Sequence, residues 1–455
     1  MTREPGDLPA HWSLLPWSRG WSRHGCSSVW ATKLCGWGCT CACRRVPVAP
    51  ARRPASVGCR RQALSSFRSG ARGGMAVRAQ GEGVIRGWCP DAWHPMAAGD
   101  GLLMRVKPHL GRMSATQAVA LCEAALTHGS GLIDLTRRAN LQIRGVSEAQ
   151  WPALLECLCT LSLVDRDGER EGRRNILVAP EWQAGDDTVR IANELRDRLT
   201  EFPQLPGKVG FVIDAGEVSA VACEAGDFRV ERGCDGTLVL RADGRAEGVR
   251  LTIGREVDAL LALARWFVDS GGVQAKRMVR HGAPLPVWAM GDTRPASSPA
   301  SLAPGEGRGH VAYGLPFGRI EARTLLALMQ RLGVTGLRLT PWRVLLVEGA
   351  SLLDVPGLLT DPADPLLRVD ACPGAPTCPQ ASVETRDLAR QLAPVVRGRL
   401  HVSGCAKGCA SPLPADVTVT GRSGRYDLAF GARADAEPLY RGLDSAEILA
   451  RLGAS

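Results

Sequence analysis

Two stretches of the sequence, "LIDLTRRANLQIRGV" (residues 132–146) and "GLRLTPWRVLLVEGA" (residues 336–350), decide the fold. They share a Leu-Thr step, a strand-like run and an ending of small residues. Upstream of each, "LGRMSATQAVALCEAAL" and "FGRIEARTLLALMQRL" place a Gly-Arg turn before a run with helical spacing, with Ser114 as the expected N-cap of the first helix. Two copies of a strand, helix and strand unit predict an internally duplicated α+β protein.

The first 74 residues differ in composition from the rest of the chain. They hold 12 Lys/Arg and two Asp/Glu, which is the whole formal charge of +10, whereas the remaining residues balance 44 basic against 44 acidic side chains. A neutral core argues against nucleic acid or an anionic membrane as the main partner. The sequence also has no apolar run of about 18 residues, the length that a membrane span needs.

Three interpretations of this basic segment are open. It is an organelle transit peptide, it contains a small metal knot at "CGWGCTCAC", or translation starts at Met75 and the upstream residues are not part of the natural protein. The lack of any shared pattern with the duplicated core favours the third, so we expect residues 1–74 to be a non-native or disordered tail. Scattered cysteines in the core fit a reducing cytoplasm.

Polar side chains alternate along the first copy of the duplicated unit. In an extended chain, one face would carry Thr136, Arg138, Asn140, Gln142 and Arg144. The run "GLLMRVKP" would put Arg105 and Lys107 on one face of a neighbouring strand. Either strand alone could be a solvated sheet face. Because the second copy reads "RVLLVEG" and lacks the polar face, the sequence favours a cationic ligand site on one side of the duplication.

Four cysteines late in the chain are spaced C-x5-C in "ACPGAPTCPQA" and C-x3-C in "HVSGCAKGCAS", and they are Cys372, Cys378, Cys405 and Cys409. Zinc ribbons commonly use two short C-x2-C knuckles. Proline- and glycine-rich loops with wider spacing suit a cubane, whose corners need separated thiolates. Zinc and four unrelated buried cysteines are the alternatives.

The chain resembles the sulfite and nitrite reductase family over residues 81–455. The resemblance is carried by the cysteine spacings, by the duplication, and by a T-x-R-x-x-x-Q pattern formed by Thr136, Arg138 and Gln142. The resemblance implies two ferredoxin-like half-domains and two larger α/β domains. The expected boundaries are 75–150 and 310–365 for the half-domains, 151–294 and 366–455 for the larger domains, and 295–309 for a proline-rich linker.

Site residues follow from the resemblance. Cys372, Cys378, Cys405 and Cys409 would hold a 4Fe-4S cluster, and in the reductases the last of the four also bridges to a siroheme. Carboxylates of the tetrapyrrole would be bound by Thr136, Arg138 and Gln142, with Arg105 and Lys107 as further substrate-binding candidates. Arg174 and Lys208 match residues around the sulfite anion and are the catalytic candidates. The second lysine of that anion cage falls on Gly210, a departure that argues against sulfite or nitrite reduction.

Within the family, "RGWCPDAWHPMAAGDGLLMRVKP" and "SGCAKGCA" resemble the precorrin-3B synthases of aerobic cobalamin synthesis. That resemblance implies O2-dependent hydroxylation of precorrin-3A at the meso carbon C-20, with a γ-lactone formed from the ring A acetate. It further implies a cytoplasmic enzyme without siroheme, which takes electrons from NAD(P)H or an electron-donor protein.

The resemblance also implies a mononuclear non-heme iron. Such iron commonly takes two histidines and a carboxylate. The candidates by position are His94, with Asp91 or Asp100 nearby, and His401. For each histidine a structural role is the alternative, and Cys89 in the same N-terminal motif is either a ligand or a core residue.

Two other classes of function remain open on the sequence alone. One is a siroheme-dependent sulfite or nitrite reductase. The other is a non-catalytic module that carries a tetrapyrrole or an iron-sulfur cluster.

Overall fold

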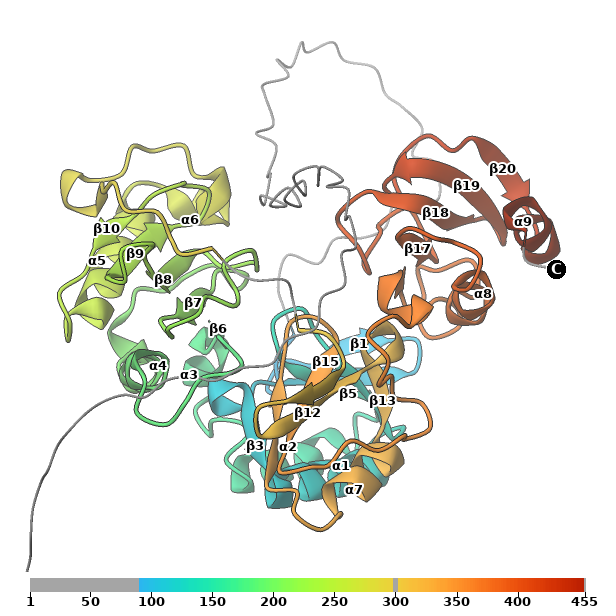
Figure 1. Cartoon of the computed structure of the whole chain (residues 1–455), viewed down its shortest axis with the longest axis horizontal. Helices are drawn as coiled ribbons and strands as arrows, with labels where there is room; N and C mark the ends of the chain where they lie inside the picture. The colour runs from blue at the N-terminus through green and yellow to red at the C-terminus, as the bar shows by residue number, and fades with distance from the viewer. Residues whose placement is uncertain (1–89, 298–301, 454–455) are drawn as a thin grey trace, which may run out of the picture. The chain divides into compact units, whose positions relative to one another are not determined.

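Four five-stranded sheets form the framework of residues 90–297 and 302–453, which are the residues that the computed structural model describes (Figure 1). Two sheets are antiparallel, and two combine parallel with antiparallel pairs. Helices accompany each kind of sheet, so the predicted α+β class is confirmed. The predicted basic tail, residues 1–74, lies outside the described residues.

The two antiparallel sheets are the two copies of the duplicated unit. The first has the order β1 (Met96–Ala98), β2 (Gly101–Val106), β5 (Leu141–Val146), β4 (Leu132–Leu135), β13 (Arg319–Glu321). The second has the order β11 (Gly305–Gly307), β12 (His310–Gly314), β15 (Val344–Glu348), β14 (Gly336–Leu339), β3 (Arg112–Ser114). Each sheet therefore takes its last strand from the other copy.

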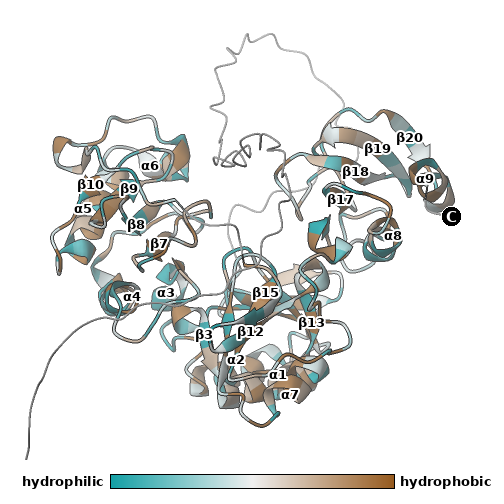
Figure 2. Cartoon of the chain, in the orientation of Figure 1, coloured by the Kyte–Doolittle hydropathy of each residue, from teal (hydrophilic) through white to brown (hydrophobic). Residues whose placement is uncertain are grey.

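The helices of the two copies share one hydrophobic core. Helix α1 (Ala115–His128) packs against α7 (Ala322–Met329) and α2 (Trp151–Thr160). Ser114 caps α1 as predicted, because its hydroxyl accepts from the Gln117 amide while the Gln117 side chain accepts from the Ser114 amide. The core joins residues of both copies, and Figure 2 shows hydrophobic residues on α1 and α7.

Arginines on the exchanged strands fasten the two copies together. Arg319 of β13 donates to both carboxylate oxygens of Asp134, at 2.7 and 3.1 Å, and Arg112 of β3 binds Glu348 with contacts of 2.6 to 3.1 Å. Burial alone would raise the pKa of Asp134, but the hydrogen bonds and charge of Arg319 outweigh it and lower that pKa. These two bonded pairs join residues 185 and 236 positions apart along the chain.

The two remaining sheets repeat one another in strand order and direction. The third contains β6 (Ile176–Val178), β7 (Phe211–Asp214), β8 (Phe228–Arg232), β9 (Leu238–Ala242) and β10 (Val249–Arg250). The fourth contains β16 (Val369–Ala371), β17 (Leu400–Ser403), β18 (Ala415–Arg422), β19 (Arg425–Ala432) and β20 (Tyr440–Leu443). In both sheets the first three strands run parallel to one another, and each of the last two is antiparallel to the strand before it. The duplication therefore extends beyond the half-domains.

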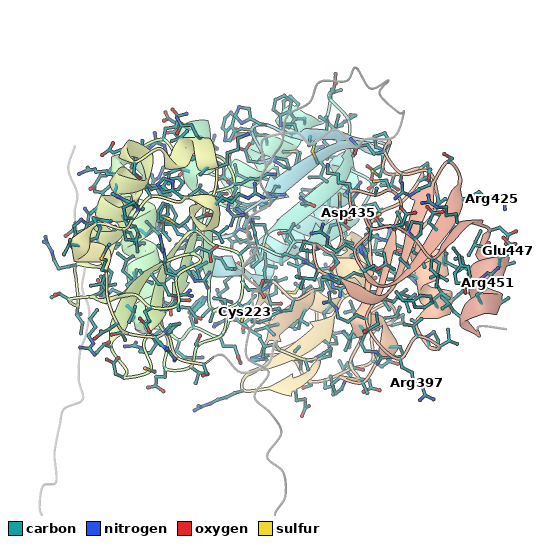
Figure 3. All side chains as sticks on the ribbon, turned by 90° about the horizontal axis from the view of Figure 1, so that it is seen from above. Cys223, Arg397, Arg425, Asp435, Glu447 and Arg451 are labelled. Atoms are coloured by element: carbon teal, nitrogen blue, oxygen red, sulfur yellow. The ribbon has the colours of Figure 1, made fainter. Side chains whose placement is uncertain are left out.

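Helices of these larger domains also correspond in position. The third sheet has α4 (Asp187–Asp197), α5 (Glu256–Asp269) and the short α6 (Gly272–Ala275), with α3 (Gly168–Arg173) before β6. The fourth has α8 (Arg386–Leu392) and α9 (Ser445–Leu452). Figure 3 labels Arg425, Glu447 and Arg451, which are exposed charged side chains of β19 and α9.

Two sequence expectations differ from the observed structure. Residues 136–140 form a turn between β4 and β5, with Ala139 at φ 51°, and not one continuous strand. The linker expected at residues 295–309 contains strand β11. The other domain boundaries stay predictions. Among the described residues, no helix is long and apolar enough to cross a membrane.

Replacing Arg319 tests how much its ion pair with Asp134 stabilises the contact between the two copies. Arg319→Met leaves the buried Asp134 carboxylate with one guanidinium partner, Arg144, so the free energy of unfolding should fall by about 3 kcal/mol at pH 7. Urea denaturation measures this. Because the folded pKa of Asp134 lies below its ordinary 3.8, the effect should be complete above about pH 4 and decline as the pH falls through the folded pKa.

The matched control for this experiment is an exposed ion pair. Arg166 pairs with Glu156, and their side chains are 63% and 64% exposed. Arg166→Gln should therefore cost less than about 1 kcal/mol. Equal losses in the two variants would contradict a structural role for the Arg319 pair.

Candidate active site

The four predicted cluster cysteines line a single cavity of about 670 Å³, which we call the cysteine-lined cavity. Cys372 is buried, Cys378 and Cys405 are half-buried, and Cys409 is exposed. The Gly404 amide donates to the Cys372 sulfur at 3.2 Å. The cavity thus brings together thiols from two loops that lie 26 residues apart along the chain.

Neighbouring parallel strands place these two loops at the same edge of the fourth sheet. Cys372 directly follows β16, and Cys405 comes shortly after β17. The carboxyl ends of parallel strands meet at one edge, which is a common place for a binding site. The Thr385 hydroxyl donates to the Cys372 carbonyl at 2.6 Å and holds the first loop in place.

Electrostatics in the cavity disfavour four free thiolates. Burial, and then the charge of the neighbouring cysteines, raise the pKa of Cys405 and Cys409, against the opposing effect of Lys407. Four thiolates at this place therefore require a positively charged partner. In the part of the chain that the structure describes, no three His, Cys, Asp or Glu side chains form a group that could hold a metal ion.

Five of the residues expected to bind substrate or take part in catalysis line the same cavity, namely Arg105, Thr136, Arg138, Gln142 and Lys208. Arg105 of β2 and Gln142 of β5 are direct partners across the first sheet. The Arg105 Nε atom is buried and has no hydrogen-bond partner among residues 90–297 and 302–453. Sequence reasoning therefore identified residues from distant segments that the fold brings to one cavity.

Arg138 occupies space beside Gly210, the position that departs from the reductase pattern. Its Nη2 donates to the Lys208 carbonyl at 2.7 Å. A Cβ at Gly210 would lie 3.6 Å from Arg138 Nη1 and 3.0 Å from the Asn175 carbonyl oxygen. The distance to Arg138 is an ordinary van der Waals contact, whereas the contact with the Asn175 carbonyl is tight, so a side chain at position 210 would press on the Asn175 backbone.

Lys107 and Arg174 lie away from the cysteine-lined cavity. Lys107 follows the end of β2, so strand alternation no longer keeps it on the face of Arg105. Its Nζ donates to the Glu171 carbonyl at 2.7 Å, and Arg174 binds the Glu171 carboxylate at 2.6 Å. Burial lowers the pKa of Lys107 to about 8. Both cations are engaged by the fully buried Glu171.

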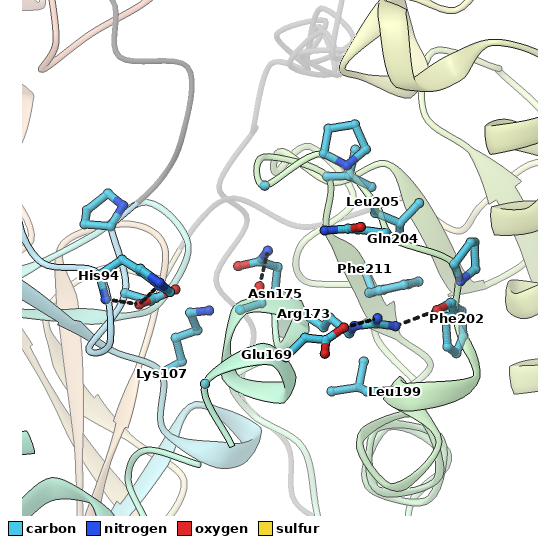
Figure 4. Close-up of a pocket in the computed structure, with 18 residues that line it drawn as sticks. His94, Lys107, Glu169, Arg173, Asn175, Leu199, Phe202, Gln204, Leu205 and Phe211 are labelled. Atoms are coloured by element: carbon cyan, nitrogen blue, oxygen red, sulfur yellow. Dashed lines mark hydrogen bonds and ion pairs between the residues drawn. The ribbon is translucent and has the colours of Figure 1, made fainter. Parts of the chain in front are cut away.

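A second cavity of about 460 Å³ contains Lys107 and His94 (Figure 4). Figure 4 shows these polar side chains on one side, with Phe202, Leu205 and Phe211 on the other. His94 Nδ1 lies 3.3 Å from Asp91 Oδ1, and the histidine side chain is 71% exposed. This cavity is mostly apolar apart from its charged rim.

The two histidines expected to bind mononuclear iron lie in different surroundings. His94 lines the second cavity, whereas His401 is fully buried in β17. Burial lowers the pKa of His401, and neither of its ring nitrogens is hydrogen-bonded to any residue that the structure describes. Asp100 is engaged by Arg144 at 2.9 Å, and Cys89 lies outside the described residues.

Sequence reasoning missed three arginines that line the cysteine-lined cavity, namely Arg137, Arg343 and Arg386. Arg137 and Arg343 both lie near the buried Asp370 carboxylate, at 3.6 and 3.2 Å. Arg386 comes eight residues after Cys378. That proximity to the cysteine motif was the signal that could have identified it.

A fold of two interlocked ferredoxin-like half-domains with two α/β domains and a cysteine-lined cavity defines a sulfite and nitrite reductase-like protein. Residues 94–159 match the family model of the nitrite/sulfite reductase ferredoxin-like half domain. The structure resembles that of the NirA protein of Mycobacterium tuberculosis, with a TM-score of 0.53 and 18% identity, over 76% of this chain and 78% of that one.

Sequence relatives show to which family within this class the chain belongs. A precorrin-3B synthase of a Sinorhizobium species is 31% identical, over 81% of this chain and 88% of the relative. A ferredoxin–nitrite reductase of Synechococcus elongatus is 25% identical, over 75% of this chain and 80% of the relative. The chain belongs to the precorrin-3B synthase family, within the sulfite and nitrite reductase superfamily.

A glycine between β1 and β2 tests how the first half-domain supports the cysteine loop. The Gly99 amide donates to the Thr377 carbonyl at 2.9 Å, and a Cβ at Gly99 would lie 2.4 Å from the Pro376 carbonyl oxygen. Gly99→Ala should displace this loop, lower the free energy of unfolding by about 1 to 3 kcal/mol and speed alkylation of Cys378.

Peptide mapping of alkylated protein and urea denaturation provide the two measurements. Gly282→Ala is the control, because a Cβ at Gly282 meets no atom within 4 Å. Unchanged alkylation of Cys378 in Gly99→Ala would contradict the support that this contact gives to the loop.

Proposed function

We propose that this protein is an oxidoreductase that hydroxylates precorrin-3A at C-20 with O2 and forms the γ-lactone from the ring A acetate. One oxygen atom of O2 enters the macrocycle and the other leaves as water. Two electrons come from NAD(P)H or an electron-donor protein, together with two protons. The supporting observation is the cysteine-lined cavity, which combines cationic and amide side chains with four thiols.

The cavity residues have separate roles in this proposal. Arg105 and Gln142 lie next to each other across β2 and β5, so they can bind the same part of the substrate rim. The buried, unpartnered Nε of Arg105 gains a hydrogen bond when a carboxylate binds, which is worth about 1.5 to 3 kcal/mol for a charged group. Arg138 and Lys208 line the cavity near Gly210, and Lys208 is the catalytic candidate that reaches it.

In this proposal the four cysteines hold an iron-sulfur cluster; among the described residues they line one cavity but do not form a compact group for a single metal ion. They come from two irregular loops at one sheet edge, and the Gly404 amide already donates to the Cys372 sulfur, as backbone amides do around clusters. Cys372, Cys378, Cys405 and Cys409 would each bind one iron. A 4Fe-4S cluster held there by all four thiolates would serve as the electron store for the reaction.

The histidines do not fit one mononuclear iron site together. His94 and His401 do not line the cysteine-lined cavity, and they belong to different surroundings. We therefore assign no step to an iron bound by this pair.

The arrangement at Gly210 supports an oxygenase over a sulfite or nitrite reductase. A small oxyanion needs a close cage of cations, and the chain has glycine where the reductase pattern has one of these lysines. A cavity of about 670 Å³ that opens to several arginines instead suits a large polycarboxylate.

An isotope experiment tests this function. The purified protein, given precorrin-3A, a reductant and ¹⁸O2, should add one labelled oxygen atom to the macrocycle, as read by mass spectrometry. It should show no siroheme absorption band and should not reduce sulfite or nitrite. Robust sulfite reduction, or product oxygen derived from water, would overturn the proposal.

Serine substitutions test the metal centre independently of the reaction. Cys372→Ser, Cys378→Ser, Cys405→Ser and Cys409→Ser should each lose most bound iron, acid-labile sulfide and visible absorbance. The control is Cys223→Ser, because Cys223 is exposed and lies outside the cavity lining (Figure 3). Stoichiometric zinc without sulfide in the wild-type protein would refute the cluster.

A further inference from the structure

Arg386 is a half-buried arginine whose Nε and Nη1 atoms are not hydrogen-bonded within the described part of the chain. It begins α8 directly after Thr385, the residue that holds the Cys372 carbonyl, and it lines the cysteine-lined cavity. Its Nε and Nη1 atoms are buried, and within the described residues neither has a hydrogen-bond partner. Leaving such a group unpaired is costly, so its environment has to be explained.

The acids near Arg386 are already engaged by other arginines. Asp134 receives hydrogen bonds from Arg319 on both oxygens and from Arg144 at 3.2 Å. Arg144 in turn binds Asp100 through two contacts of 2.9 Å. Two guanidiniums, those of Arg319 and Arg144, therefore take up both carboxylates, and among the described residues Arg386 forms no ion pair with either acid. Burial and then the positive charge of Arg319 lower the pKa of Arg386 to about 10.

Arg386 lines the cavity, so an anion bound there can reach its guanidinium, which lies 5.7 Å from the centre of the Phe317 ring. Arg105, from β2, also presents an unpartnered Nε to the same cavity. The two arginines come from different domains, the first half-domain and the fourth-sheet domain. A ligand that satisfies both must carry carboxylates at separate points of its periphery.

We infer that Arg386 binds a peripheral carboxylate of the tetrapyrrole substrate on the cysteine side of the cavity. This inference rests on the proposed function, and it adds a specificity-determining residue that favours macrocycles with a carboxylate at that position. We expect Arg386 to add little stability to the ligand-free protein, because its Nε and Nη1 make no hydrogen bond within the described residues and Arg319 and Arg144 repel it, against the attraction of Asp134.

Equilibrium binding of uroporphyrin III, a macrocycle with eight carboxylates, and of precorrin-3A under anaerobic conditions tests the assignment. Arg386→Gln and Arg386→Met should weaken binding of both by roughly 10- to 100-fold, the loss expected for one charged hydrogen-bonded contact. Arg386→Lys keeps the charge and should recover part of the affinity. Bound iron and sulfide should stay at the wild-type level in all three variants.

Arg390→Gln is the matched control. Arg390 lies one turn further along α8 and contacts the same Phe317 ring, at 4.9 Å, but it is exposed and outside the cavity lining. Its loss should change affinity less than about twofold.

Stability of the ligand-free protein separates a binding role from a structural one. Removing an uncompensated buried cation should leave the urea midpoint of Arg386→Met unchanged or higher. Wild-type affinity in both neutral variants, or a lower midpoint together with weaker binding, would overturn the role of Arg386 while leaving the proposed function intact. A wild-type protein that binds neither tetrapyrrole would overturn both.

Discussion

The ion pairs between exchanged strands are the constraint on which the rest of the structure depends. Arg319 reaches from the second copy to Asp134 in the first, and Arg112 reaches from the first copy to Glu348 in the second. Each acid also binds an arginine of its own copy, Arg144 or Arg338. Neither half-domain can complete its sheet without the other, so the two copies fold as one core.

This interlock fixes the geometry of the cavity. Strand β13 lies beside β4, so the turn at residues 316–318 before β13 brings Phe317 to the cavity that Gln142 and Cys372 also line. The equivalent turn before β3 contains Leu110, and both residues have positive φ, 57° and 55°. A left-handed conformation in a non-glycine residue is uncommon, so its repetition at equivalent positions marks the turn as part of the duplicated design.

The extent to which sequence predicted this site depended on the kind of signal. The cysteine spacings and the polar pattern at Gln142 are local, and residues from both line one cavity. Lys107 does not share the position of Arg105, because β2 ends at Val106. The alternation of polar and apolar residues in the sequence does not show where a strand ends. Arg386 has no ion-pair partner among the described residues because Arg319 and Arg144 bind Asp134 and Asp100. These contacts form between strands that are distant in the sequence, so the sequence alone could not predict them. The turn at residues 136–140 likewise required a positive φ at an alanine.

A duplicated fold has two equivalent positions for a binding site, and in this chain side chains fill one of them. The segment after β6 corresponds to the cysteine loop after β16. It contains Trp182, whereas the cysteine loop lines the cavity. Trp182 lies 4.0 Å beneath the Arg338 guanidinium, and its indole donates to the Leu110 carbonyl at 3.0 Å. Arg338 is thus neutralised by Glu348 and covered by an aromatic ring. In the first copy the carboxylate and the arginine have exchanged strands, as Asp134 on β4 and Arg144 on β5, and the described residues that line the cavity there include no tryptophan. The reversal of charge, together with the loss of this aromatic cover, explains how two similar halves produce a single cationic cavity beside the cysteines.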